Sequence, residues 1–262
     1  MDNNVLASDH VDSILGAIRN EGFERGAKWG KKMRVVDFNQ GIDARLVTTQ
    51  MAKNLATINL TPVRLAFDFD GVELQYRSAV ARLATVGFRH FTNYLMFNFN
   101  DAPESLYRRM KVNLELTQRL DVAITGFPMR YIPIDHVDRQ YVSPGWRWRY
   151  LRGIQCVLLA THGMVSPNPD FFAAAFGESY EGFIEILSMP DRYIVHRKEF
   201  KSNQARDWRR RFRRLSKSSR AELLGILADL NRSRDKQRDI AKHREFRRLL
   251  EHYYPAEEGA VP

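Results

Sequence analysis

The feature that most constrains this 262-residue chain is a regular exchange between strand-like and helix-like apolar spacing. Short apolar runs that predict strands alternate with longer segments in which apolar residues recur every three or four positions. The expected strands are 34–42, 62–69, 89–99 and 121–134, and the expected helices are 10–22, 48–58, 72–87 and 103–120. The repeat is about 30 residues long, which fits a strand, a crossover helix and two loops.

Strands joined through helices run parallel, because the crossover returns the chain to the same end of the sheet. We therefore expect an α/β fold, a partial (β/α) TIM-like barrel over residues 1–200 with helices on its outer face. Pro128 lies within the fourth expected strand. Because proline cannot donate a ladder hydrogen bond, this strand is expected at an edge or at a bend.

Polar side chains gather where each expected strand ends, and in parallel folds those ends meet at one rim. The group comprises Gln40, Asp43 and Arg45 after the first strand, Asp68 after the second, Asn98 and Asp101 after the third, and Met129 and Arg130 within the fourth. A helix cap is the simpler explanation for Asp101 alone. Four such groups in register favour a ligand site at the strand ends.

Several segments in this order resemble the later part of the barrel in radical S-adenosylmethionine enzymes. The segments that carry the resemblance are DNNVLASDHVDSIL (2–15), VDFNQGIDARLVT (36–48), PVRLAFDF (62–69), YLMFNFNDAPESLYRR (94–109) and FPMRYIPI (127–134). The resemblance implies a partial barrel whose strand ends face S-adenosylmethionine and a 4Fe–4S cluster. It covers about residues 1–200.

The resemblance also implies roles for individual residues. Asp2, Asn3 and Asn4 would lie where a second barrel strand ends, near the methionine amino group. Gln40, Asp43 and Arg45 match polar positions after the third strand, and Asp68 matches those after the fourth. By the same comparison, Asn98 and Asp101 approach the nucleoside, and Met129 and Arg130 lie near adenine.

The chain departs from this family at the cluster motif. The family carries CxxxCxxC after its first strand, and this sequence has a single cysteine, Cys156, in the apolar run IQCVLLA. One thiolate cannot replace three. Two explanations fit: a reading frame whose cluster segment lies upstream, or a barrel that has lost its redox chemistry. We expect the first, because a parallel sheet without its first strands has an unpaired edge.

The positive charge is concentrated in the tail. Residues 1–196 hold 22 Lys and Arg against 21 Asp and Glu, whereas residues 197–262 hold 19 against 10. We expect residues 201–262 to form a basic helical extension with helices at 203–215 and 218–250. An apolar cluster in the second helix should pack on other elements; its members are Leu223, Leu224, Ile226, Leu227 and Leu230.

Two functions of different class follow from these patterns. The first is a radical S-adenosylmethionine-type enzyme whose cluster thiolates come from a missing N-terminal segment or partner fragment. The second is a non-catalytic protein that uses the barrel as a scaffold and binds RNA or DNA through the basic tail 197–252, where arginines neutralise phosphates. A solvated basic helix is an equally good explanation of the tail. Because no long apolar segment or signal-peptide pattern is found, we expect a cytoplasmic protein that does not enter membranes.

Overall fold

The computed structural model describes residues 4–136 and 140–255 of the chain. The chain divides into two compact units. Unit 1 comprises Met1–Pro133 and Met164–Phe172, and unit 2 comprises Ile134–Gly163 and Ala173–Pro262. These bounds differ from the division near residue 200 that the charge distribution indicates, because segments 134–163 and 173–200 cluster with the basic tail.

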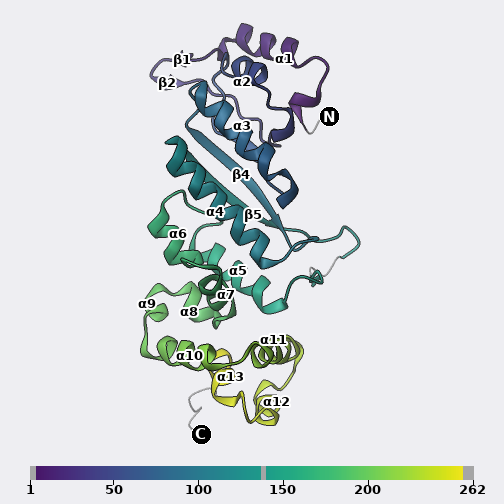
Figure 1. Cartoon of the computed structure of the whole chain (residues 1–262), viewed down its shortest axis with the longest axis vertical. Helices are drawn as coiled ribbons and strands as arrows, with labels where there is room; N and C mark the ends of the chain where they lie inside the picture. Colours follow the sequence, from purple (N-terminus) through teal and green to yellow (C-terminus); the bar gives the residue numbers. More distant parts are fainter. Residues whose placement is uncertain (1–3, 137–139, 256–262) are drawn as a thin grey trace. The chain divides into compact units, whose positions relative to one another are not determined.

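The centre of unit 1 is a parallel sheet of three strands, β3 (Val63–Ala66), β4 (His90–Phe97) and β5 (Ala123–Arg130), in the order β3-β4-β5. Helix α3 (Glu73–Thr85) connects β3 to β4, and α4 (Pro103–Leu120) connects β4 to β5. The two helices pack against each other and lie along the strands (Figure 1). The expected α/β class with parallel strands is therefore confirmed. The order also confirms the edge position of β5, the strand that contains Pro128.

One face of the sheet forms the core of unit 1. Along β4, buried and half-buried residues alternate, and Phe91, Leu95 and Phe97 belong to the buried set. Asn93 is also fully buried and lies in a closed polar network with α3 and α4. Its side chain bonds reciprocally with Asn113 at 3.0 and 3.1 Å, and the Tyr76 hydroxyl donates to Asn113 at 2.9 Å. Burial raises the pKa of Tyr76, so its hydroxyl stays protonated and can donate.

The expected strand at 34–42 is wrong. This segment makes only two isolated parallel bridges, between Val36 and Leu60 and between Ile42 and Leu65. Asn39 and Gln40 form a turn, and Gly41 has φ of 86°, a left-handed conformation that glycine adopts without steric cost and that interrupts an extended strand. The described residues therefore form a sheet of three strands rather than four, and they form no closed barrel.

The remaining elements of unit 1 are short. They are η1 (Val5–Ala7), α1 (Val11–Ile18), η2 (Arg19–Phe23), the antiparallel pair β1 (Lys28–Trp29) and β2 (Lys32–Met33), η3 (Ala44–Leu46), α2 (Thr49–Leu55) and η4 (Asp70–Val72). Thr48 caps α2, because its hydroxyl accepts from the Met51 amide at 3.1 Å. On the outer side of β5, Gly126 and Val165 form an antiparallel bridge. The chain passes from unit 1 to unit 2 within α6 (Pro169–Phe176).

All secondary-structure elements among the described residues of unit 2 are helices. Its helices are α5 (Trp148–Ala160), α7 (Tyr180–Ser188), α8 (Asp191–Val195), α9 (Arg197–Phe200), α10 (Asn203–Arg214), α11 (Lys217–Arg232), α12 (Lys236–Lys242) and α13 (Arg247–Tyr253). The first expected tail helix is confirmed as α10. The second is wrong as one helix, because α11 ends at Arg232 and a new helix, α12, starts where the Asp235 carboxylate accepts from the Arg238 amide. The apolar cluster of α11 is buried, as expected.

Helices α5 and α7 meet through their backbones. Gly153 of α5 is buried, and a Cβ placed on it would lie 2.3 Å from the carbonyl oxygen of Leu187. Because no real side chain tolerates that distance, this helix contact requires glycine at position 153. Among residues 4–136 and 140–255, none of the helices combines the length and the hydropathy of a membrane-spanning segment.

Candidate ligand site at the strand ends

A cavity of about 250 Å³ lies at the carboxyl end of β3. Three separate segments line it: Asn4 near the start of the chain, the loop from Gln40 to Arg45, and residues just past β3 that include Asp68 and Phe69. The structure thus brings together half of the ten residues that the sequence assigns to a cofactor site. These five are Asn4, Gln40, Asp43, Arg45 and Asp68.

Asp43 and Arg45 form a pair on one wall of the cavity. Asp43 caps η3 by accepting from the Arg45 amide at 2.9 Å, and its carboxylate also accepts from the Arg45 guanidinium at 2.6 Å. These hydrogen bonds lower the pKa of Asp43 and raise that of Arg45. Asp43 and Arg45 therefore neutralise each other, while the Arg45 side chain remains exposed and can still donate hydrogen bonds to an anionic group of a ligand.

Asp68 offers the opposite charge. Its carboxylate is half-buried and accepts a hydrogen bond from the Met96 amide, but it forms no ion pair among the described residues. Burial raises the pKa of Asp68, and the nearby positive charge of Arg109 opposes that rise. A carboxylate that is desolvated without its own counter-ion is a natural partner for a cationic or hydroxyl group of a ligand.

The loop that carries Gln40 and Asp43 is held beside β3 by a few backbone contacts. The Ile42 amide donates to the Arg64 carbonyl at 2.8 Å, and the Ile42 carbonyl accepts from the Ala66 amide at 3.4 Å. The Tyr94 hydroxyl adds a third contact, donating to the Asn39 carbonyl at 3.2 Å. Because Gly41 turns the chain immediately before Ile42, the polar side chains on both sides of Ile42 line the cavity.

Arg109 of α4 organises the floor beneath this rim, and the sequence analysis missed it. Its side chain is fully buried. One nitrogen, Nη1, lies 2.7–3.0 Å from three carbonyl oxygens that follow or end β3 and β4, those of Phe67, Asp68 and Met96. The signal was present in the sequence, because Leu106, Arg109, Asn113 and Leu116 fall on one helix face at spacings of three and four.

The other predicted site residues do not line this cavity. Asp101 accepts from the Phe99 amide and from Arg109, so its carboxylate has structural partners. Asn98 is fully buried with φ of 67° and donates to the Tyr131 carbonyl at 2.9 Å. Met129 and Arg130 are exposed at the end of β5. Asn3 and Asp2 lie outside the described residues.

The described residues contain no group of three or more His, Cys, Asp or Glu side chains that could hold a metal ion. Cys156 is buried in α5 of unit 2, where burial raises the pKa of its thiol to about 11. Comparison with known proteins finds no family model that matches the chain, and no curated protein or solved structure with significant similarity to it.

Proposed function

We propose that unit 1 binds S-adenosylmethionine at the carboxyl ends of its parallel strands, as the later part of a radical S-adenosylmethionine-type partial barrel. One observation carries this proposal. Five residues that were assigned to the cofactor from three separate segments of the sequence line a single cavity.

The charges around the cavity suit the zwitterionic methionine end of that molecule. Asp68 provides a carboxylate for the methionine ammonium, and exposed Arg45 provides a guanidinium for the methionine carboxylate. Asn4 adds an amide oxygen for the methionine ammonium, as the resemblance implies, and Gln40 adds an amide that can bond to a ribose hydroxyl. A volume of about 250 Å³ is below the usual 300–1,000 Å³ of ligand pockets. The cavity therefore accommodates one end of the ligand, and the other end extends along the rim.

The residues present do not fit a 4Fe–4S cluster. Such a cluster needs three or four thiolates, and this chain has one cysteine, which is buried in the other unit. Any cluster that acts with this chain would take its thiolates from other residues. The proposal therefore concerns binding and orientation of the cofactor, and no redox step is assigned to this chain.

Calorimetric titration of S-adenosylmethionine into the full chain tests the proposal. We expect a Kd of about 0.1–1 mM, because a binding free energy near −4 to −5.5 kcal/mol is what a few charged contacts supply without metal coordination. Asp68→Asn and Gln40→Ala should each weaken binding about ten-fold, since each removes a polar contact of roughly 1.4 kcal/mol.

Asp121→Asn is the matched control, because Asp121 is an exposed residue of unit 1 outside the cavity and Asn tolerates its left-handed backbone. Competition with adenosine and with methionine shows which end occupies the cavity. The proposal is wrong if S-adenosylmethionine does not bind, or if the cavity variants and the control bind it equally well.

A further inference from the structure

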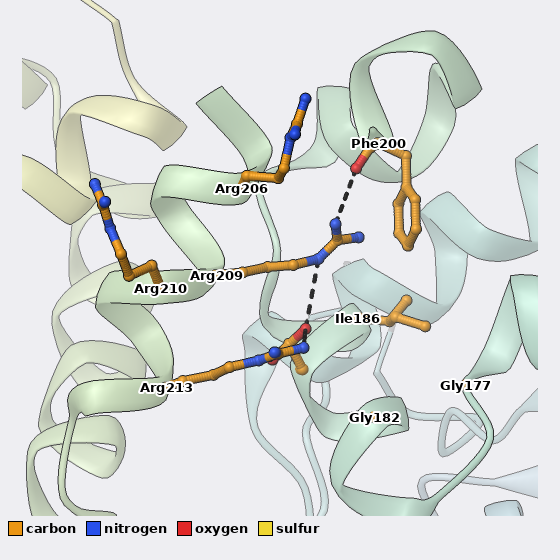
Figure 2. A pocket seen from close by; sticks show the side chains of 9 residues that line it. Gly177, Gly182, Ile186, Phe200, Arg206, Arg209, Arg210 and Arg213 are labelled. Atoms are coloured by element: carbon orange, nitrogen blue, oxygen red, sulfur yellow. Dashed lines mark hydrogen bonds and ion pairs between the residues drawn. The ribbon is translucent and has the colours of Figure 1, made fainter. Parts of the chain in front are cut away.

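Unit 2 contains a larger cavity, of about 670 Å³, lined by four arginines of α10 and by a single carboxylate. The arginines are Arg206, Arg209, Arg210 and Arg213, and the carboxylate is that of Glu185 from α7. Figure 2 shows that the four arginines project from α10, with Arg209 and Arg213 extending toward Phe200 and Ile186 and Arg210 turned away from those two residues. All of these residues belong to unit 2.

The carboxylates near α10 are too few to neutralise its arginines. Glu185 is shared, because it contacts Arg213 at 2.5 Å and Arg209 at 3.4 Å. Asp207 is shared in the same way by Arg210 and Arg211. Arg206 is exposed and makes no hydrogen bond or ion pair with the described residues. The cavity lining thus carries an excess of positive charge, which favours an anionic ligand.

The residues that line the cavity favour one class of anion, the phosphates of a nucleotide. Guanidinium groups match the oxygens of phosphate in bidentate fashion. Residues three or four apart on a helix advance about 4.5–6 Å along its axis, so the arginines of α10 offer a series of positive charges to a ligand with more than one phosphate. Phe200 and Ile186 supply an apolar surface for a base or sugar, and the Arg209 guanidinium lies 4.1 Å above the Phe200 ring.

We propose that this cavity is a binding site for nucleotide phosphates, either of a mononucleotide or of a single-stranded RNA or DNA. Arg206 and Arg210 bind the phosphates, and Arg209 and Arg213 are available to them in competition with Glu185. The site is independent of the proposed S-adenosylmethionine site, because it lies entirely in unit 2.

Fluorescence anisotropy with the full chain and a labelled twelve-nucleotide single strand tests this inference. The double variant R206Q/R210Q should weaken binding about ten-fold and reduce the slope of log K against log salt by roughly 1.4, because each phosphate contact on a single strand contributes about 0.7 to that slope. R244Q/R248Q removes the same charge from two exposed arginines outside the cavity, and it should leave both values unchanged. Melting temperatures of the variants verify that each is folded.

A variant with the opposite expected sign strengthens the test. Glu185→Gln removes the only carboxylate of the lining and frees Arg209 and Arg213, so binding should become several-fold tighter. Unlabelled competitors identify the source of the phosphate: competition by AMP as strong as by the oligonucleotide indicates a mononucleotide site, and much stronger competition by the oligonucleotide indicates a strand site.

Three results would overturn the proposal. Equal losses in R206Q/R210Q and R244Q/R248Q would indicate diffuse charge rather than a site. Adenosine competing as well as AMP would exclude the phosphate as the recognised group. Preference for an acidic peptide over the oligonucleotide would assign the cavity to a protein partner.

Discussion

The Arg109 guanidinium and the Asp101 carboxylate form an ion pair at 2.8 Å, with the arginine side chain fully buried and the aspartate side chain 9% exposed. Asp101 begins the connection into α4, and Arg109 lies two turns further along that helix. The pair therefore joins the loop after β4 to the carbonyl groups at the ends of β3 and β4. Its role is to support the rim on which the proposed ligand site stands.

Asp101→Asn should lower the free energy of unfolding by about 3 kcal/mol, because it leaves the buried guanidinium with only the more distant Asp70 carboxylate, at 3.6 Å, as an ion-pair partner. Urea denaturation measures this loss. Asp121→Asn makes the same chemical change at an exposed residue and should cost less than about 0.5 kcal/mol. Equal stability of the two variants would show that the Arg109–Asp101 pair contributes no more than a surface aspartate.

The buried polar network of β4 gives a second prediction. Asn113→Ala removes the acceptor for the Tyr76 hydroxyl and both reciprocal bonds with Asn93. Two buried partners are left unsatisfied, so we expect a loss of about 2–4 kcal/mol in urea denaturation. Asn100→Ala, at an exposed position in the loop after β4, is the control and should be nearly neutral. A loss below about 1 kcal/mol for Asn113→Ala would contradict the closed network.

The ionisation of Asp68 should affect how the free energy of unfolding depends on pH. Its folded-state pKa is raised by burial, so ionisation destabilises the folded state above that pKa and has no effect below the unfolded pKa, where the carboxyl is protonated in both states. Asp68→Asn should therefore raise the unfolding free energy at pH 7 by about 0.5–2 kcal/mol and change little at pH 3. The same variant should lose S-adenosylmethionine affinity.

That combination separates a binding residue from a structural one. If the Asp68 carboxylate had a structural role, its replacement would lower the free energy of unfolding at pH 7. If Asp68→Asn is less stable than the wild type at neutral pH, the assignment of Asp68 to the ligand site is contradicted.

Two helical glycines of unit 2 should respond to alanine with opposite signs. Gly153→Ala places a methyl group against the Leu187 carbonyl and should cost about 2–3 kcal/mol, as overpacking of a close contact does. Gly225 of α11 is exposed with no atom within 4 Å of an added Cβ. Gly225→Ala should therefore stabilise the protein by about 0.5–1 kcal/mol. Thermal unfolding of both variants checks the pair, and a neutral Gly153→Ala would contradict the close approach of α5 and α7.

Local sequence signals predicted the helices and strands whose cause is itself local. The expected bounds of α4, 103–120, agree with the structure because Pro103 suits a first turn and the apolar spacing continues to Leu120. The prediction of a strand at 34–42 was wrong because strand pairing depends on the neighbouring strand. That neighbour, β3, extends over only four residues and offers a short edge for pairing. The prediction of one long second tail helix was wrong because the helical apolar spacing continues past Asp235, although Asp235 caps the start of a separate helix.

The candidate site likewise combines features that follow from local sequence with features that depend on tertiary contacts. Strand-end placement was sufficient to predict that Gln40, Asp43 and Asp68 share one cavity. It was not sufficient for Asn98 or Asp101, because their side chains turn to partners that tertiary contacts provide. Arg109 was missed for a related reason: its carbonyl partners Phe67 and Asp68 are about 40 residues away in sequence.

The way in which the loop that carries Gln40 and Asp43 is attached affects how fast this part of the protein opens. Ile42 holds that loop to β3 through its own amide and carbonyl, whereas the Phe67 amide donates into the sheet, to the Tyr94 carbonyl at 3.0 Å. A wall held by a few separate contacts opens by local fluctuation, and a strand paired along its length opens only when the unit unfolds. The Ile42 amide should therefore exchange its hydrogen with solvent far sooner than the Phe67 amide. Entry and departure of the proposed ligand would then require only that this loop moves away from β3, and the rate of global unfolding would not limit either step.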